Sequence, residues 1–233
     1  MNLYKVRMYL KHNKLIYGIY CKLNRKRWEK KRVETRAALA EHGFSMVEEI
    51  EQILKDQGTL YFLSFGNLLG LEREGHFLRH DNDVDYSIFI NDKFTWDMLE
   101  ACMRQSGYEK IRQYSLCGEI REQTYRKGTL SVDFFSCKNE EDGTTALNFF
   151  RKDGYYYASK EEMHVIEIKF VKVNTVKKAT YGDLTVTVPS DPVAYLESVY
   201  TKDWRIPNPN WSSEMYPNSR VLKEMGSKDL YLG

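Results

Sequence analysis

The sequence predicts an α+β fold (mixed α/β), in which a mixed β-sheet is flanked by helices and preceded by a basic helical extension. Helix-like patterns occupy the residues before 58 and the segment after residue 191. Between them, short apolar runs and a spacing of two are typical of strands. Because no low-complexity linker divides these 233 residues, a single α/β or α+β core is favoured over several small ones.

Residues 1–40 are expected to form one or two helices, because no proline interrupts them. Ser45, followed by Glu48, has the pattern of a capping box and predicts the start of a further helix that stops at Gly58. The predicted domains are therefore a basic helical N-terminal extension, residues 1–40, and a globular domain, residues 41–233.

Shorter elements are expected between Leu60 and Gly107. The apolar run at 60–65 predicts a buried strand, and the helical turn at 67–73 should end at Gly75. A strand at 83–90 and a helix at 95–105 follow, and Gly107 closes that helix.

Strands dominate the region after residue 107. They are expected at 108–115, 119–125, 129–136, 155–158, 165–173 and 184–188. The polar stretch 138–148 is expected to be a loop. Asp191 as cap and Pro192 at the first helical position predict a helix to about Tyr200. The tail from Trp204, in which prolines recur, is expected to be irregular.

The cysteines bear on where the chain is found. Cys21, Cys102, Cys117 and Cys137 have neither metal-ligand nor redox spacing, which favours reduced thiols in a cytosolic protein. No apolar run approaches the roughly 18 residues needed to cross a bilayer. The first residues also lack the apolar region and cleavage site of a signal peptide. We therefore expect a cytoplasmic location.

The net charge of +2 is distributed unevenly. Residues 1–36 hold 12 Lys/Arg against two acids, a net of +10, while the remaining residues hold 23 against 31, a net of −8. Basic and apolar side chains alternate in this first segment. It therefore suits peripheral contact with an anionic membrane at the inner face, or packing on the domain or on a second copy. A nucleic-acid partner is not expected, because a body of net −8 repels phosphate backbone.

A group of aspartates carries the strongest chemical signal. Asp81, Asp83 and Asp85 lie at the start of the strand predicted at 83–90. Residues two apart on a strand point the same way, so Asp83 and Asp85 should converge. Converging carboxylates repel each other unless a divalent cation such as Mg²⁺ lies between them. The blander alternative is a solvated turn before the strand.

Asp133 lies inside the apolar strand predicted at 129–136. A lone carboxyl group there is costly unless it is paired or bound to metal. The alternative is a structural acid bonded to backbone or to an arginine. Together the four aspartates predict a metal-dependent enzyme that acts on a phosphate compound.

The motifs around these aspartates resemble a known family. Phe62-Leu-Ser-Phe-Gly-Asn-Leu-Leu-Gly-Leu-Glu-Arg73, followed by Gly75-His-Phe-Leu-Arg-His-Asp-Asn-Asp-Val-Asp85, is similar to the core signature of the LicD/fukutin-type phosphotransferases. These belong to the nucleotidyltransferase fold superfamily. The later blocks at 131–135, 181–189, 195–200 and 203–207 are also similar, so the resemblance covers roughly residues 45–207.

The resemblance implies a role for each motif residue. Gly66 and Asn67 would form a turn that lets backbone N–H groups approach a phosphate. The catalytic residues would be Asp83, Asp85 and Asp133, and the ligands of Mg²⁺ or Mn²⁺ would be Asp81, Asp83, Asp85 and Asp133. Asp133 would be a third ligand or the base, and Asp81 would bind the metal through water. The substrate-binding residues would be Gly66, Asn67, Arg73, His76, Arg79 and His80; for the basic ones, ordinary solvated charge is the alternative.

The chain departs from the family pattern at several positions. Asn67 stands where Thr or Ser is usual, Arg79 and His80 replace a Pro-Trp pair, Asn82 replaces Asp, and Thr201 stands where Gly is frequent. Because the acids two apart are kept, catalysis is expected. The changed neighbours leave the identity of the donor and the acceptor open.

The resemblance implies a phosphotransferase that moves a phospho-alcohol, such as phosphocholine or a polyol phosphate, from a CDP-activated alcohol donor. The acceptor would be a hydroxyl of a cell-surface or lipid-linked glycan, as in lipopolysaccharide, capsule or teichoic acid modification, and CMP would be released. Two alternatives stay open. One is a nucleotidyltransferase that moves NMP from an NTP to a small molecule or protein, and the other is a non-catalytic partner of a glycosyltransferase.

Overall fold

The computed structural model describes residues 14–152, 155, 157–211 and 215–231. Its helices are α2 (Lys14–Leu54), α3 (Phe65–Glu74), α4 (Trp96–Gln105) and α5 (Pro192–Tyr200). Its strands are β1 (Tyr61–Leu63), β2 (Val84–Ile88), β3 (Glu109–Leu116), β4 (Glu119–Lys127), β5 (Leu130–Ser136), β6 (Lys138–Asn139), β7 (Thr144–Phe150), β8 (Glu162–Phe170), β9 (Val176–Tyr181), β10 (Leu184–Pro189), β11 (Ser219–Val221) and β12 (Gly226–Leu230).

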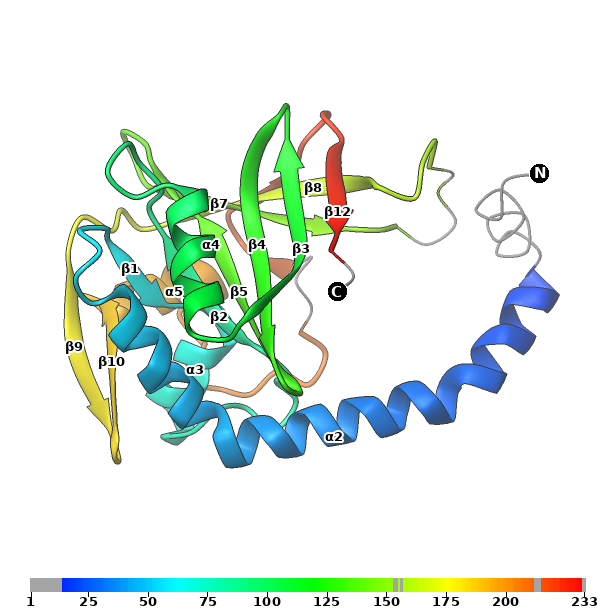
Figure 1. The fold of residues 1–233 in the computed structure, drawn as a ribbon, viewed down its shortest axis with the longest axis horizontal. Coiled ribbons are helices and arrows are strands. Elements are labelled where there is room, and N and C mark those ends of the chain that lie inside the picture. The colour runs from blue at the N-terminus through cyan, green and yellow to red at the C-terminus, as the bar shows by residue number, and fades with distance from the viewer. Residues whose placement is uncertain (1–13, 153–154, 156, 212–214, 232–233) are drawn as a thin grey trace.

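The strands form one large mixed sheet and one hairpin, which confirms the predicted α+β class. The ten-stranded sheet has the order β1-β2-β5-β4-β3-β12-β8-β7-β6, with β11 paired to β8, and β9 and β10 pair separately. Among the strand pairs of the described chain, β2–β5 is parallel and the others are antiparallel. The sheet curls, so that β7 comes near β4 and β5 (Figure 1).

The helices lie against this sheet at several places. Helix α2 contacts β5 and β10, α4 contacts β3, and α5 contacts β8 and β10. The cap predicted at Asp191 is confirmed, and Thr95, predicted as the first residue of its helix, is also a cap. The Thr95 side chain accepts a hydrogen bond from the Met98 N–H at the start of α4, and Asp191 accepts one from Ala194 at the start of α5.

Helix α2 corrects the prediction of a helix starting at Ser45. It runs unbroken from residue 14 to residue 54, so Ser45 lies inside the helix rather than at a cap. The nearby Gly43 also lies inside the helix, where the ring of Phe77 packs against it and leaves no room for a side chain. A Cβ at Gly43 would lie 2.8 Å from Phe77 Cε2. The division of the chain at residue 40 stays a prediction, although Leu39 is already part of the buried core.

The N-terminal half of α2 reaches beyond the sheet (Figure 1). Its exposed apolar side chains are Ile19, Leu23, Trp28 and Val33. Residues 1–13, which the predicted basic extension also includes, lie outside the described residues.

Three predictions about strands and loops are wrong. The supposed loop at 138–148 contains β6 and most of β7, whose Thr144 and Thr145 look polar but are buried by pairing with β8. The supposedly irregular tail contributes β11 and β12, and β12 pairs with both β3 and β8. No strand is assigned to the described residues 155, 157 and 158.

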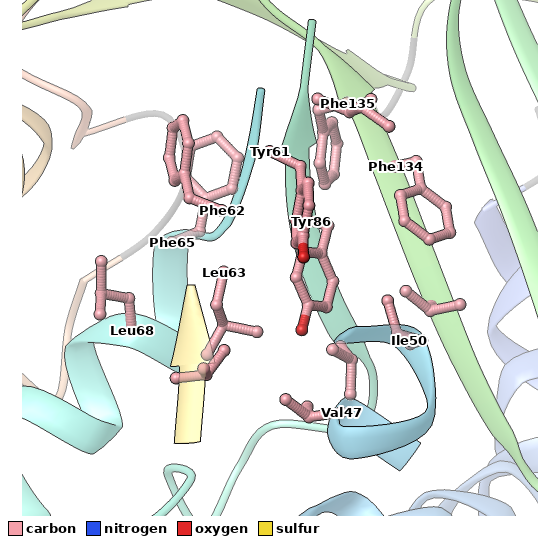
Figure 2. Packing of buried hydrophobic residues seen from close by; sticks show 14 of the residues in the cluster. Val47, Ile50, Tyr61, Phe62, Leu63, Phe65, Leu68, Tyr86, Phe134 and Phe135 are labelled. Atoms are coloured by element: carbon pink, nitrogen blue, oxygen red, sulfur yellow. The ribbon is translucent and has the colours of Figure 1, made fainter. Parts of the chain in front are cut away.

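The main core lies between α2 and the β1–β2–β5 part of the sheet. Figure 2 shows Val47 and Ile50 of α2 close to Tyr86 of β2 and Phe134 of β5. The Tyr86 and Phe134 rings stack with their centroids 5.9 Å apart. This packing fixes the two parallel strands that carry the candidate site.

A buried carboxylate joins α2 to the same strands. Glu51 is 4% exposed and accepts hydrogen bonds from the hydroxyls of Tyr61 (3.2 Å) and Tyr86 (3.0 Å). It also accepts from the backbone N–H of Thr187 at 3.0 Å and pairs with the ammonium of Lys178. Helix α2 is therefore attached to β1, β2, β9 and β10 through one side chain.

Two further sequence predictions concern thiols and membrane spans. Cys102, Cys117 and Cys137 are free thiols, while the side chain of Cys21 lies outside the described residues. Within the described part of the chain, no helix combines the length and the apolar character that crossing a bilayer requires.

A candidate active site at a cluster of aspartates

One row of side chains crosses four strands of the sheet at the candidate site. Asp85 of β2 is the register partner of Asp133 on the parallel strand β5. Asp133 is in turn paired with Thr124 on β4, and Thr124 with Arg112 on β3. Register partners lie on the same face of a sheet, so the row presents two carboxyl groups, a hydroxyl and a guanidinium to one side.

Asn67 holds the segment that leads into β2. This residue is 1% exposed, and its Nδ2 donates to the backbone carbonyl of Asp83 at 3.1 Å. Its Oδ1 accepts from the backbone N–H of Asp85 at 2.6 Å. The Asp81 carboxylate closes the segment on the other side by accepting from the Leu78 N–H at 3.3 Å. One amide side chain therefore sets the backbone positions of Asp83 and Asp85.

Gly66 and Asn67 lie in the first turn of α3, not in the tight turn predicted for them. The glycines of this segment serve close packing rather than an unusual backbone angle. A Cβ at Gly66 would lie 3.3 Å from Asp81 Oδ1, and one at Gly70 would lie 2.6 Å from the His76 carbonyl. The N-terminal end of α3 is thereby brought against the aspartate segment, where its backbone N–H groups favour a negative charge.

Burial raises the pKa of the three carboxyl groups of this segment, and neighbouring carboxylates raise those of Asp83 and Asp85 further. Burial, more than any neighbour, raises the pKa of Asp81 to about 6. Burial, followed by the charges of Asp133 and Asp81, raises the pKa of Asp83 to about 7. The pKa of Asp85 is raised well above its ordinary value by burial and then by Asp83 and Asp133. Such mutual repulsion shows that these groups converge.

Asp133 has one cation beside it. Burial raises its pKa, while the charge of Arg112 and a hydrogen bond from Thr124 lower it. The Nη2 of Arg112 lies 3.6 Å from Asp133 Oδ1, too far for a normal hydrogen bond, and this oxygen has no hydrogen-bond partner among the described residues. The one positive charge of Arg112 therefore does not balance the carboxyl groups of Asp83, Asp85 and Asp133.

The basic residues predicted to bind substrate differ in their placement. Of the four, His80 and Arg73 lie close enough to Asp81 for their charges to lower its pKa, though by less than burial raises it. The guanidinium of Arg73 is bonded to Glu74 and to the Trp204 carbonyl. His76 and Arg79 are exposed. The roles predicted for these four residues stay predictions.

Sequence reasoning missed several residues at this site. Arg112 and Thr124 belong to the row, and Glu122 precedes Thr124 by two residues on β4, which places it on the same face. Burial and then the charge of Asp133 raise the pKa of Glu122 well above its ordinary value. The alternating polar positions of β4 were a signal for it. Burial and then the charge of Asp85 raise the pKa of Tyr216, which lies in the tail predicted to be irregular.

The donor atoms fit a hard divalent cation. They are carboxylate oxygens, they carry more negative charge than Arg112 balances, and one buried oxygen of Asp133 lacks a partner. Among the described residues, no three His, Cys, Asp or Glu side chains are arranged so that they could hold a metal ion by themselves. An ion here would therefore take one or two carboxylates and complete its shell with water and substrate phosphate, as Mg²⁺ usually does.

An α+β sheet that aligns two aspartates on a parallel strand pair, beside a helix N-terminus, defines a nucleotidyltransferase-type domain. Comparison with protein families agrees with this class. The family described as "LicD/FKTN/FKRP, nucleotidyltransferase domain" matches residues 58–191, more than half of the 233 residues. The chain belongs to this family.

Curated relatives share this region. "Ribitol-5-phosphate transferase FKTN" of Mus musculus is 28% identical over 169 residues, which cover 70% of this chain and 33% of the relative. The Homo sapiens protein of the same name is 26% identical with the same coverage. An uncharacterized protein of Rickettsia prowazekii (strain Madrid E) is 22% identical over 185 residues, covering 78% and 61%. The chain thus spans about a third of the length of the ribitol-5-phosphate transferases.

Proposed function

We propose that this protein is a metal-dependent phosphotransferase. It moves a phospho-alcohol, such as phosphocholine or a polyol phosphate, from a CDP-activated donor to a hydroxyl of a glycan, with release of CMP. The observation that carries the proposal is the convergence of Asp83, Asp85 and Asp133 on one face beside the N-terminus of α3. The names of the FKTN relatives support a polyol phosphate as the transferred group.

Asp83 and Asp85 would hold Mg²⁺ or Mn²⁺, with Asp81 contributing through water. When bound, the cation neutralises negative charge that develops on the leaving nucleotide. Asn67 keeps the two aspartates in place through the Asp83 carbonyl and the Asp85 N–H. Preorganised groups of this kind supply most of the rate in phosphoryl transfer.

Asp133 is the proposed general base. The acceptor hydroxyl attacks the phosphorus atom that carries the alcohol, the bond from this phosphorus to the CMP oxygen breaks, and the hydroxyl proton passes to a carboxylate oxygen of Asp133. A base must lie within hydrogen-bond reach of that proton. Asp133 Oδ1, which has no hydrogen-bond partner among the described residues, is free to accept it. Arg112 favours the charged form of Asp133 that this step needs.

We further propose that the reaction takes place in the cytoplasm, at the inner membrane face, with residues 1–36 against anionic lipid. The support is the charge of this segment and the exposed Leu23, Trp28 and Val33 on α2. Deletion of residues 1–36 should release the protein from anionic vesicles and leave metal binding intact. Unchanged co-sedimentation of the deleted protein with the vesicles would contradict the membrane contact.

A donor screen tests the chemistry. The protein is incubated with Mg²⁺ or Mn²⁺ and CDP-choline, CDP-glycerol, CDP-ribitol or an NTP, and CMP and pyrophosphate are followed by mass spectrometry. Metal-dependent CMP release that an Asp83→Ala/Asp85→Ala variant lacks supports the proposal. Release of pyrophosphate from an NTP would instead favour nucleotidyl transfer. Absence of both from the wild type, in the presence of glycan acceptors, would favour a non-catalytic role.

A further inference from the structure

Three cationic side chains from three parts of the chain lie near one another, and one of them, Arg112, lies beside Asp133. Arg112 lies on β3, Lys228 lies on the neighbouring strand β12, and Arg151 directly follows β7. Lys228 is the register partner of Tyr114, and its Nζ lies 5.7 Å from the centre of that ring. Tyr114 follows Arg112 at a spacing of two along β3, so Arg112 and Lys228 lie on the same face of the sheet. Arg151 donates to the carbonyl of Glu162, whose register partner Ser227 precedes Lys228 on β12.

Two of these cations, Lys228 and Arg151, have no carboxylate partner among the described residues. Among the described residues, no Asp or Glu oxygen lies within ion-pair distance of Lys228 or Arg151, in contrast to Arg112 at 3.6 Å from Asp133. Arg151 donates to the carbonyls of Ser159 (2.9 Å) and Glu162 (3.1 Å), which fixes it without neutralising it.

The three charges repel one another. The pKa of Lys228 is lowered by burial and then by the nearby charges of Arg112 and Arg151. Glu122, the acid that faces this group from β4, offsets the repulsion only in part, because its charge raises the pKa of Lys228 by less than the charges of Arg112 and Arg151 lower it. Like charges brought together at a half-buried position, which the nearby acid does not balance, are the usual surroundings of a bound anion.

We propose that Arg112, Lys228 and Arg151 form an anion subsite that binds a phosphate group of the nucleotide-activated donor. This inference rests on the proposed function. Arg112 connects the two sites, since it lies beside both Asp133 and Lys228. Adjacent strands are about 4.8 Å apart, so β5 and β12 are roughly 14 Å apart across three steps, within reach of a nucleoside diphosphate and these long side chains.

The test measures anion binding without a divalent cation. Calorimetric titration of the full chain with inorganic pyrophosphate in EDTA at low salt should detect binding, and Lys228→Met should weaken it at least fivefold. Lys228→Arg should restore it, because the charge returns. Lys223→Met is the matched control, since Lys223 is an exposed lysine of the same tail, and it should bind like the wild type. Arg151→Gln should also weaken binding and provides a second variant should Lys228→Met fail to fold.

The results separate this inference from the proposed function. Undetectable pyrophosphate binding by the wild type, or equal affinity in Lys228→Met, Arg151→Gln and wild type, overturns the subsite whatever the enzyme assay shows. The proposed function is tested separately, by whether the wild type releases CMP from a donor in a metal-dependent reaction. Titration with CDP tests whether the bound phosphate belongs to the nucleotide donor. Lys228→Met should bind CDP more weakly than the wild type, as it should pyrophosphate. If Lys228→Met binds pyrophosphate more weakly but binds CDP as tightly as the wild type, the assignment of the subsite to the donor is wrong.

Discussion

Asp85 and Asp133 occupy the same register position of the parallel pair β2–β5, so the sheet itself places their two carboxyl groups side by side. Neither can move away without breaking the ladder between the strands. Burial raises the pKa of both groups, and the charges of Asp83 and Asp133 raise that of Asp85 further. The fold therefore maintains an electrostatic conflict that a bound cation would relieve, which is typical of active sites rather than of structural cores.

The first prediction follows from the raised pKa values. Folding raises the pKa of Asp81 from 3.8 to about 6 and that of Asp83 from 3.8 to about 7. Between pH 4 and 7 the folded state therefore binds more protons than the unfolded state, so the free energy of unfolding falls as pH rises through this window. In EDTA, we expect the melting temperature at pH 8 to be roughly 2–6 °C below that at pH 5, as for a loss of about 1–2 kcal/mol.

Two controls identify the carboxyl groups as the cause. In Asp83→Asn the decrease between pH 5 and 8 should become smaller, and the variant should melt above the wild type at pH 8. Added Mg²⁺ should raise the melting temperature of the wild type at pH 8 and have little effect on the variant. A wild-type melting temperature that rises from pH 5 to 8 would contradict this account.

The aspartates were predictable because their signal is local. A spacing of two on a strand is enough to make Asp83 and Asp85 converge, and an acid inside an apolar strand is enough to single out Asp133. The α+β class was equally accessible from the helical and alternating patterns. The role of Asn67 in positioning the aspartates was not predictable from the sequence, because it depends on hydrogen bonds to residues 16 and 18 positions away.

The cationic side of the site depends on strand order, which a single sequence does not reveal. Arg112 reaches the row through irregularities in the β3–β4 register, at 110–112 and 114–115. Lys228 lies near it because β12, from the far end of the chain, is inserted between β3 and β8. Its strand sequence Gly-Ser-Lys-Asp-Leu has little apolar pattern, so its pairing partners on both sides, rather than its own residues, determine the strand.

The second prediction concerns Asn67. Asn67→Ala removes both bonds that fix the aspartate segment and leaves buried backbone groups without partners, which should cost about 1–3 kcal/mol of stability. Activity should fall further than stability, because the positions of Asp83 and Asp85 become less defined. Asn67→Asp keeps an acceptor for the Asp85 N–H but adds a carboxylate near three others. It should therefore be less stable at pH 8 than at pH 5. Urea unfolding at the two pH values measures both effects, and wild-type activity in Asn67→Ala would argue against a positioning role.

The third prediction compares two glycines of the same motif. A Cβ at Gly70 would lie 2.6 Å from the His76 carbonyl and 2.9 Å from the Leu78 N–H, both backbone atoms. Gly70→Ala should therefore displace the loop that leads to Asp81, with a loss of several kcal/mol and of activity. Gly75 has a left-handed φ of 73° but open space around it, so Gly75→Ala should cost only about 1–2 kcal/mol. Thermal melts of the two variants give the comparison, and an equal loss in both would mean that close packing at Gly70 is not what selects glycine.

The last prediction links the buried Glu51 to the site. Glu51→Ala leaves the hydroxyls of Tyr61 and Tyr86 and the Thr187 N–H without their acceptor inside the protein. Breaking a buried, paired carboxylate of this kind typically costs about 3–5 kcal/mol. Tyr86→Phe removes only the hydrogen bond from the Tyr86 hydroxyl to Glu51, so it should cost about 1 kcal/mol of stability. Tyr86 is the neighbour of Asp85 on β2, and this small loss should shift the strand little. Glu48→Ala, on the exposed side of the same helix, is the control and should change stability by less than about 0.5 kcal/mol. Urea unfolding measures all three, and a Glu51→Ala loss as small as that of Glu48→Ala would show that apolar packing alone attaches α2 to the sheet.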